Sequence, residues 1–421
     1  MRVLVVSHNV FSKTTGMGKT LSAYFRDFKP CELAQLYIHS EIPVDSLCER
    51  YYRVTDSDML RSILIRKSGT AFTKEDIQPL RPHSRTDRGL AAKLYRAAGK
   101  RTPIIYFLRN MLWKIGRWKT PAFQKWLDEF DPQAVFFASG DYAFLYCVAR
   151  EIATERNLPL YVSCMDDFYF YDRNQNLLFG KCQHTRFMRQ VSRTMQAAAA
   201  IFAICDRMAR DYGAFFHKPV YVLHTGSDIT EPFPAGGDRI SYIGNLSLGR
   251  DHQLCALGRA LQRVTGGERW LDVYSTETDP ARLKQMTKEN GIRFGGALDA
   301  AGVRRVMGES LLLVHTESFE NPWRQLVSYS VSTKIADSLA SGRCLFAYGP
   351  PEVASIAYLR EYNAAFCVLD EKELDKGLAR ILREESLRQS TVAHALALAA
   401  QNHQIGRNSR LIRQVLEETI K

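Results

Sequence analysis

Short apolar runs rich in β-branched residues alternate with helical patterns along the chain, and this alternation restricts the fold more than any other feature of the sequence. Such runs are typical of strands buried on both faces of a parallel sheet, with the helices as crossover connections. The pattern therefore predicts an α/β protein. In the first half, strands are predicted at residues 3–7, 36–39, 134–138, 160–164, 201–205 and 220–224, and helices at residues 21–28, 123–130, 143–156 and 185–198.

The alternation stops within residues 225–238, where three glycines and two prolines indicate a linker, and then starts again. At 421 residues the chain also exceeds the usual size of one hydrophobic core. We therefore predict two doubly wound, Rossmann-like domains facing each other across a cleft, residues 1–230 and 231–421. The last helix, near residues 408–420, is a candidate to pack back on the first domain. In the second half, strands are predicted at residues 240–243, 271–274, 292–294, 311–315, 344–347 and 365–368.

The nine cysteines form no C-x-x-C pair and mostly lie within apolar runs, which indicates reduced core residues and not a disulfide framework or a zinc site. The apolar run after Met1 is too short for a secretory signal, and no stretch approaches the roughly 20 apolar residues of a membrane span. We expect a cytoplasmic protein, or one that is peripheral on the inner face of a membrane.

The net charge of +12 is concentrated in one insertion, residues 81–119, where eleven lysines and arginines accompany the single acid Asp87. Within it, apolar residues recur at helical spacing in residues 104–119. A basic amphipathic helix can lie on an anionic membrane surface, whereas the alternative is a helix packed on its own domain with a solvated basic face. No nucleic-acid recognition motif accompanies the cluster, so nucleic acid is not expected as a partner.

The segment with the clearest chemical pattern begins with polar residues at the start of a predicted helix. The backbone N–H groups at Ser332 and Thr333 can meet an anion there, and Lys334 reaches the same place from the first helical turn. Asp337 shares that helix face and can accept hydrogen bonds from ribose hydroxyls, unless it and Lys334 form an ordinary surface pair. Gly342 then ends the helix before a buried strand. This order of parts suits a nucleoside diphosphate.

The segment 332–342 resembles the donor site of GT-B glycosyltransferases, in particular the large retaining group known as family 4 or group 1. The strand at 240–243 and the turn from Gly244 to Arg250 are similar to the glycine turn of that family, which has a basic residue just after it. Residues 292–296 match its strand-then-glycine element. The resemblance extends in order over residues 239–370.

This resemblance implies that Arg250 and Lys334 are catalytic residues, which neutralise the diphosphate as its leaving charge grows. It also implies that Gly244, Thr333 and Asp337 bind the donor, a nucleotide sugar.

The acid pair of the family is altered, because Tyr329 stands eight residues before Asp337, where the family has a glutamate. In its place we expect Glu320 to face the donor sugar, from the loop after the strand at 311–315. Glu317 in the same loop is the alternative.

Two glycines, Gly16 and Gly18, precede the first predicted helix, where they let the backbone approach a phosphate or a sugar closely. The resemblance implies that this loop shapes the acceptor site. The run 13–20 also ends in Gly-Lys-Thr, as in the phosphate-binding loop of an NTPase, although Lys13 stands where that motif has a small residue.

Asp166 and Asp167 follow the strand at 160–164, and such strand ends collect functional groups in open α/β sheets. We expect Asp166 to act in catalysis and Asp167 to bind the acceptor; the alternative is that both cap the following segment. His8 and Asp141 follow two other strands and are weaker candidates for the acceptor side.

The D-x-D motif of Asp56 and Asp58 lies in a polar loop far along the sequence from the donor segment. Because two cations already face the predicted diphosphate, no metal and no other cofactor is expected.

The sequence thus favours a glycosyltransferase that moves a sugar from a nucleotide-sugar donor to a glycan or a lipid-linked acceptor, in the assembly of surface polysaccharide. Retention of the anomeric configuration is implied by the resemblance alone. Two alternatives stay open: a nucleotide-sugar epimerase of the same fold, and an NTPase that uses residues 13–20.

Overall fold

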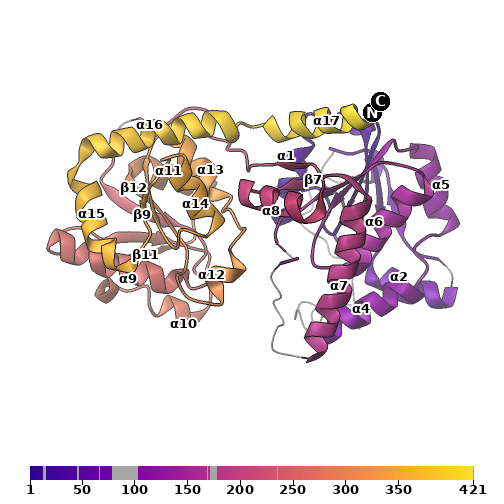
Figure 1. Cartoon of the computed structure of the whole chain (residues 1–421), viewed down its shortest axis with the longest axis horizontal. Helices are drawn as coiled ribbons and strands as arrows, with labels where there is room; N and C mark the ends of the chain where they lie inside the picture. Colours follow the sequence, from indigo (N-terminus) through magenta and orange to yellow (C-terminus); the bar gives the residue numbers. More distant parts are fainter. Residues whose placement is uncertain are drawn as a thin grey trace. The chain divides into compact units, whose positions relative to one another are not determined.

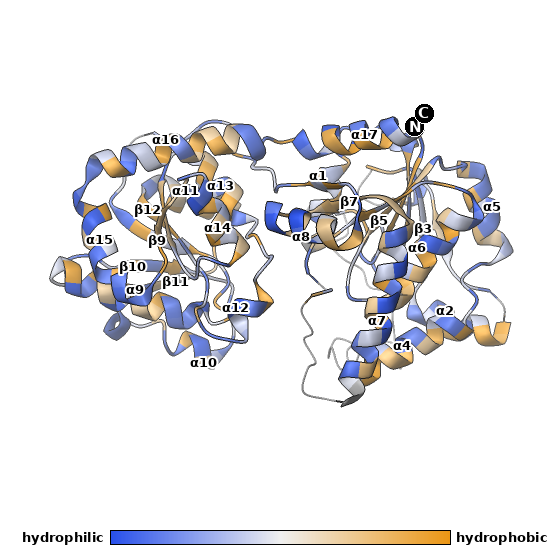
Figure 2. Ribbon diagram, in the orientation of Figure 1, coloured by the Kyte–Doolittle hydropathy of each residue, from blue (hydrophilic) through white to orange (hydrophobic). Residues whose placement is uncertain are grey.

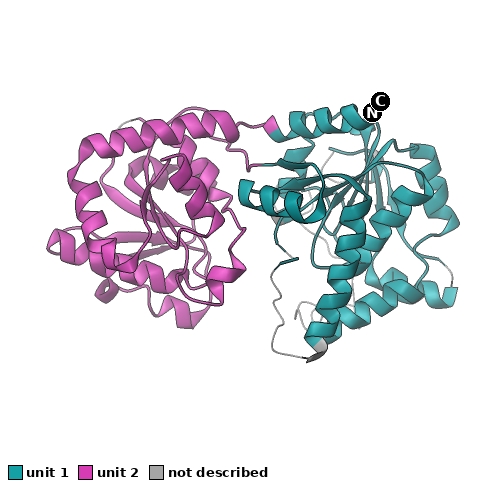
Figure 3. Ribbon diagram, in the orientation of Figure 1, with its two compact units in different colours: residues 1–223, 408–421 teal, residues 224–407 magenta. Residues whose placement is uncertain are grey.

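The computed structural model describes residues 1–12, 16–44, 47–65, 67–77, 103–167, 169–170, 178–234 and 236–420. The chain forms two compact units, one of residues 1–223 and 408–421 and the other of residues 224–407 (Figures 1 and 3).

The division differs from the predicted domains in two places. It falls after Leu223, ahead of the predicted boundary at residue 230, because the imidazole of His224 already stacks on Tyr358 of the second unit at 5.3 Å between ring centroids. The second unit also stops at Arg407 and not at residue 421, since the final helix, the candidate to pack back, lies in the core of the first unit.

The described residues of the first unit contain an eight-stranded sheet in the order β4-β3-β2-β1-β5-β6-β7-β8. Neighbouring strands are parallel except β3 and β4 at one edge, which are antiparallel. The strands are β1 (Val3–Ser7), β2 (Leu33–Tyr37), β3 (Arg50–Arg53), β4 (Thr70–Phe72), β5 (Ala134–Ala138), β6 (Leu160–Ser163), β7 (Ala198–Ala203) and β8 (Val220–Val222).

Helices flank this sheet, and β1, β2 and β5 are buried along their whole length. Two helices share one core with the sheet. This core contains Leu21 of α1, Phe25 just after α1, and Ile412 and Leu416 of α17. The helices are α1 (Gly16–Tyr24), α2 (Asp56–Ile65), α4 (Pro103–Ile115), α5 (Pro121–Phe130), α6 (Ala143–Glu155), α7 (Leu178–Ala197), α8 (Asp206–Phe216) and α17 (Arg407–Ile420), with 3-10 turns η1 (Pro30–Glu32) and η2 (Lys74–Asp76).

The second unit contains a six-stranded parallel sheet in the order β11-β10-β9-β12-β13-β14. Its strands are β9 (Arg239–Ile243), β10 (Leu271–Tyr274), β11 (Ile292–Gly296), β12 (Ser310–Thr316), β13 (Cys344–Tyr348) and β14 (Phe366–Val368). Its helices are α9 (Arg250–Thr265), α10 (Pro280–Leu283), α11 (Ala300–Glu309), α12 (Trp323–Leu326), α13 (Lys334–Ala340), α14 (Ala354–Glu361), α15 (Leu374–Arg383) and α16 (Glu385–Asn402), with 3-10 turns η3 (Lys288–Asn290) and η4 (Glu371–Glu373).

Strands in the middle of this sheet divide their side chains between two apolar cores, as the alternation of a strand allows. On β12, Leu312 and Val314 pack with α9 and α15, whereas Leu313 packs on the other side with α11, α13, α14 and α16. Helices therefore cover both faces, which confirms the predicted α/β class of two parallel-sheet domains.

The twelve predicted strands are all present, whereas β3 and β4 were not predicted. The β3 sequence Arg-Tyr-Tyr-Arg has a charged residue at each end and so does not form an apolar run. Of the helices in the described residues, none is both long enough and apolar enough to cross a bilayer.

Candidate active site

A cavity of about 400 Å³ opens where β9 and β12 end in the second unit. The strand order reverses at this point, because β10 lies on one side of β9 and β12 on the other. Open α/β sheets bind ligands at such a switch point, outside the carboxyl ends of the strands. The cavity lining includes Gly244, Arg250, Thr333, Lys334 and Asp337, so the fold brings these five predicted residues together.

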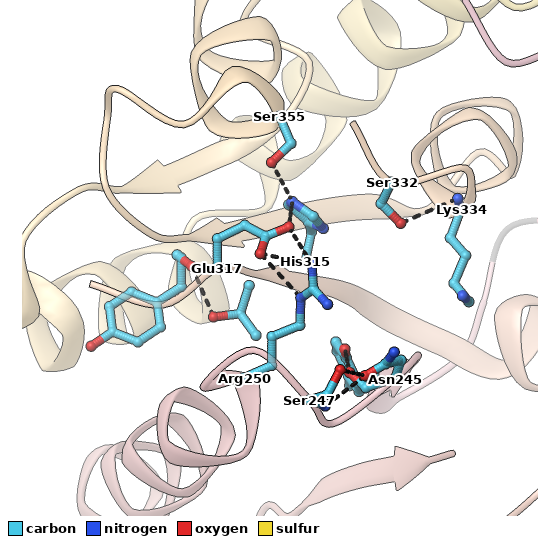
Figure 4. Close-up of polar contacts among 11 residues, drawn as sticks. Asn245, Ser247, Arg250, His315, Glu317, Ser332, Lys334 and Ser355 are labelled. Carbon is cyan, nitrogen blue, oxygen red and sulfur yellow. Dashed lines mark hydrogen bonds and ion pairs between the residues drawn. The ribbon is translucent and has the colours of Figure 1, made fainter. Parts of the chain in front are cut away.

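Arg250, the first residue of α9, forms a two-pronged ion pair with Glu317, just past the end of β12 (Figure 4). Its Nε donates to Oε2 at 3.1 Å and its Nη2 to Oε1 at 2.9 Å. The Glu317 side chain is only 1% exposed. Burial raises the pKa of Glu317, and the positive charge of Arg250 opposes that shift. The pair fixes the guanidinium at the cavity wall.

His315, near the end of β12, is a neutral part of the same wall. Burial, followed by the charges of Arg250 and Lys334, lowers the pKa of His315 to about 3. Its Nε2 lies 3.0 Å from the hydroxyl of Ser355. An imidazole in this state adds no charge to the cavity near neutral pH.

Lys334 is the cation of the cavity that no carboxylate holds. It is exposed at the rim, and in the described part of the chain its Nζ has no ion-pair partner. Desolvation by the cavity walls, and then the charge of Arg250, lowers the pKa of Lys334, while Asp337 raises it. Figure 4 shows its side chain extended and separate from the Arg250–Glu317 pair. An anion is the natural partner for this ammonium group.

The backbone at the start of α13 offers little to an anion, so that side chains would have to bind most of its charge. The helix is only seven residues long, and the N–H groups of Lys334 and Ile335 already bond to Ser332, at 3.4 Å to its hydroxyl and 3.1 Å to its carbonyl. Thr333 precedes the helix and is exposed, and its side chain makes no capping bond.

Asp337 connects this helix to the segment that leads into the second unit. The hydroxyl of the buried Ser227 donates to Asp337 Oδ1 at 2.7 Å. A carboxylate has several acceptor positions, so further donors can approach Asp337 from the cavity.

The turn between β9 and α9 contributes Gly244 and Asn245 to the cavity lining, and its backbone is closely packed at Gly249. Gly249 has φ +74°, and a Cβ there would lie 2.6 Å from the hydroxyl oxygen of Ser318. Within the turn, Asn245 Oδ1 accepts from the backbone and the hydroxyl of Ser247, at 2.5 and 2.6 Å. These contacts hold the turn in the conformation that presents Arg250.

No protein-family model and no curated protein sequence matches the chain. Solved structures match over its full length. HepE of Anabaena in complex with UDP has a TM-score of 0.62 at 11% identity, covering 99% of this chain and 100% of that one. A UDP-forming alpha,alpha-trehalose-phosphate synthase from Burkholderia xenovorans has a TM-score of 0.61 at 12% identity, covering 100% and 99%. WaaG, a glycosyltransferase involved in lipopolysaccharide biosynthesis, has a TM-score of 0.56 at 11% identity, covering 98% and 99%.

The chain has the GT-B fold. At this level of sequence identity the structural similarity establishes the fold alone, so the activity has to be argued from the site.

The two candidate acids of the loop after β12 lie in different surroundings. Glu320 lies outside the cavity lining, half exposed, with one oxygen 3.2 Å from the imidazole of His252. Glu317 instead takes the buried position beside Arg250. The only signal for this in the sequence is that Glu317 directly follows the buried β12, whereas Glu320 lies further out in the loop.

In the first unit, Asp167 is used to build the turn after β6. Its Oδ1 accepts from the N–H groups of Tyr169 and Phe170, both at 3.1 Å, and from the hydroxyl of Tyr212 at 2.8 Å. Asp166 accepts from the backbone of Asp167 at 3.0 Å. These bonds match the capping alternative for both residues, and their predicted roles toward an acceptor stay predictions.

Gly16 and Gly18 lie in the first turn of α1 and not in a loop ahead of it, which corrects the predicted start of this helix. A Cβ on Gly18 would lie 2.5 Å from the carbonyl oxygen of Val10, so the contact that requires glycine here is with the chain's own backbone. Residues 13–15 of the predicted glycine run lie outside the described residues.

A polar cluster that includes both weaker candidates lies at the switch point of the first sheet, between β1 and β5. The His8 ring stacks on Tyr142 at 4.7 Å, and Arg109 of α4 lies 4.3 Å from the centre of the same tyrosine ring. Tyr106, also on α4, donates to Asp141 Oδ2 at 2.5 Å. Burial, followed by Arg109, lowers the pKa of His8 to about 4. The contribution of α4 was not predicted.

In the described residues, no group of three or more His, Cys, Asp or Glu side chains could hold a metal ion. Asp56 of the D-x-D motif pairs with Arg109 at 2.9 Å, and Asp58 accepts from the backbone and hydroxyl of Thr55, at 2.9 and 2.8 Å. Both acids of this motif therefore have structural partners.

Proposed function

We propose that this protein is a glycosyltransferase that binds a nucleotide sugar in the cavity of the second unit and transfers the sugar to a glycan or a lipid-linked acceptor. The observation that carries the proposal is the cavity between β9 and β12, where Lys334 pairs with no carboxylate of the described residues and Glu317 holds Arg250 in place. Two cations at one switch point suit a diphosphate.

The chemistry that we propose follows from where charge develops. As the glycosidic bond to the donor phosphate breaks, negative charge grows on the diphosphate, and the preorganised Arg250 and Lys334 stabilise it. Asp337 accepts the ribose hydroxyls, and Gly244 and Thr333 shape the space around the diphosphate. Because both cations come from the protein, the proposal includes no metal ion.

Three structural neighbours support this proposal. The HepE structures contain UDP, one of them together with glucose, and an E. coli trehalose-6-phosphate protein was solved with UDP-2-fluoro glucose. WaaG is described as acting in lipopolysaccharide biosynthesis. We infer a role in surface polysaccharide assembly at the cytoplasmic side, with retention of configuration expected from the family resemblance.

Lys334→Ala tests the proposal, with Lys288→Ala, an exposed lysine outside the cavity lining, as the matched control. We expect UDP or GDP to raise the melting temperature of the wild type and of Lys288→Ala. Removing a charge-assisted phosphate contact should weaken binding by about 10- to 100-fold in Lys334→Ala.

Three results would contradict the proposal. Equal nucleotide binding by both variants would remove Lys334 from the site. A larger shift with ATP and magnesium than with UDP or GDP would favour the NTPase alternative. A converted nucleotide sugar, formed from the donor alone without acceptor, would indicate an epimerase.

A further inference from the structure

The helix α4 presents its apolar stripe outward. Ile104, Leu108, Met111 and Ile115 are spaced along one face of the helix, and all four are exposed, Ile104 by 61% and Leu108 by 59%. A helix on the surface of a globular protein normally turns this stripe toward the core. The outward orientation of this apolar stripe suggests that it contacts something outside the chain.

The opposite face of α4, which carries Tyr106, Arg109 and Trp113, is firmly attached to the first unit. Arg109 pairs with Asp56 of α2 at 2.9 Å, and Trp113 Nε1 donates to the same carboxylate at 2.8 Å. Tyr106 bonds to Asp141, and the Trp113 ring stacks on Phe144 at 4.4 Å. Because specific polar contacts fix this face inward, the outward apolar stripe is built into the fold.

The neighbouring helix α2 shows the same reversal. Its buried residues are Met59 and the polar Ser62, and Ser62 accepts from the backbone N–H of Arg117, just after α4, at 2.9 Å. Gly116 packs against Met59, where a Cβ would lie 2.9 Å from the sulfur. The exposed apolar residues of α2 are Leu60, Ile63, Leu64 and Ile65, with Leu64 exposed by 85%. Figure 2 shows hydrophobic segments along both helices.

Unpaired cations accompany these apolar side chains. Arg61, Lys67, Lys114 and Arg117 are exposed, and within the described residues none of their side chains pairs with a carboxylate. Residues 103–119 contain no acid. We call the exposed apolar side chains of α2 and α4, together with these four cations, the α2–α4 face.

We propose that the α2–α4 face docks on the surface of an anionic membrane. Apolar side chains on helices with basic flanks are the pattern of a peripheral helix that inserts into the interface of a bilayer, and the cations attract anionic headgroups. A second copy of the chain is a poorer occupant, because two basic faces would repel each other. The proposal rests on the proposed function, since docking would bring the first unit to a lipid-linked acceptor.

Vesicle flotation tests the proposal with the full chain and without any substrate. We expect wild-type protein to float with vesicles of phosphatidylglycerol and phosphatidylcholine in equal parts, and to stay behind with pure phosphatidylcholine. Replacing both Lys114 and Arg117 by alanine should weaken binding to the anionic vesicles by about 30-fold, at roughly fivefold for each cation near the surface. Leu64→Ser with Leu108→Ser should weaken it by on the order of tenfold.

Matched control variants carry the same changes elsewhere. Lys125→Ala with Arg210→Ala removes two exposed cations, and Phe215→Ser with Ile405→Ser removes two exposed apolar side chains. Both controls should float like the wild type. The shift of melting temperature by UDP or GDP should be unchanged in all variants. A wild type that floats but shows no such shift would count against the proposed function and not against docking.

The docking proposal is overturned if the wild type does not float with anionic vesicles, or if the controls lose as much binding as the α2–α4 variants. It is also overturned if the α2–α4 variants change the oligomeric state in light scattering while flotation stays the same, because the face would then be an interface between copies.

Discussion

The two cations of the cavity differ because only one has a buried acid beside it. Glu317 holds Arg250 in a fixed direction and neutralises its charge, whereas Lys334 at the rim pairs with no carboxylate of the described residues. A buried ion pair is weak evidence for stability, but removing one partner leaves a charge that cannot be solvated. The pair therefore links stability and ligand binding in a way that mutation can separate.

Arg250→Ala should lower both the stability of the second unit and its affinity for a diphosphate. Leaving Glu317 buried and unpaired should cost about 3–5 kcal/mol of unfolding free energy. Adding Glu317→Gln should restore much of that stability, because the buried charge is gone, without restoring binding. Urea unfolding and titration of UDP or GDP measure the two effects. If the double variant also recovers binding, the guanidinium does not contact the ligand.

If Lys334 binds the diphosphate as proposed, we expect binding to depend on pH in the alkaline range. In the free protein its pKa lies below the ordinary value of 10.5, mainly through desolvation, and a bound diphosphate favours the charged form and raises that pKa. Binding is therefore strong below the free-state pKa and weakens as pH rises through it, at lower pH than for an ordinary lysine.

Calorimetric titration of the nucleoside diphosphate from neutral to alkaline pH measures this dependence. Lys334→Arg is the comparison, since arginine stays charged throughout the range. We expect the arginine variant to bind with little change over pH. The same decline in both proteins would assign it to another group.

At the scale of elements, α9 is flanked at each end by a capping glycine with positive φ, yet the two positions differ in their surroundings. A Cβ on Gly249 would meet Ser318 and Trp323 at 2.6 and 2.8 Å, whereas a Cβ on Gly266 would meet nothing within 4 Å. The first position is therefore constrained by both backbone conformation and space, and the second by conformation alone.

Gly249→Ala should weaken diphosphate binding strongly, because the turn that presents Arg250 must move. Gly266→Ala, at the other end of the helix, should cost only about 1 kcal/mol of stability and leave binding unchanged. Thermal unfolding with and without UDP or GDP compares the two variants directly. Equal losses of affinity would show that the β9–α9 turn has no special part in binding.

Most of the fold could be predicted from the sequence because its strands are buried on both faces and therefore form continuous apolar runs. β3 could not, since Arg50 and Arg53 interrupt the run. The resemblance to GT-B glycosyltransferases grouped Gly244, Arg250, Lys334 and Asp337 in advance, and all four line one cavity.

Two features of the molecule could not be predicted from local pattern. The partner of Arg250 lies 67 residues away along the chain, and no local spacing connects it to Glu317. The reversed faces of α2 and α4 depend on tertiary contacts such as Arg109 with Asp56, which periodicity does not contain. Periodicity finds an amphipathic helix, but packing decides which face turns inward.

At the scale of the whole molecule, the chain starts and ends in the same unit, and its last helix completes a core that its first strand begins. Leu416 of α17 is fully buried in the cluster that also holds Val3 and Val5 of β1. Arg413 adds an ion pair with Glu32 at 2.8 Å, and its hydrogen bond to that carboxylate lowers the pKa of Glu32 to about 2. The stability of the first unit therefore depends on residues that follow the whole second unit in sequence.

Leu416→Ala should destabilise the first unit by about 2–5 kcal/mol and leave the second unit as it was. Leu398→Ala, a buried leucine of α16 in the second unit, is the reciprocal control. Amide hydrogen exchange reports on each unit, through β1 for the first and β12 for the second. Leu416→Ala should speed exchange in β1 alone and Leu398→Ala in β12 alone, because each leucine belongs to a separate core. Faster exchange of both strands in both variants would mean that the units unfold together, and that the two cores form one cooperative system.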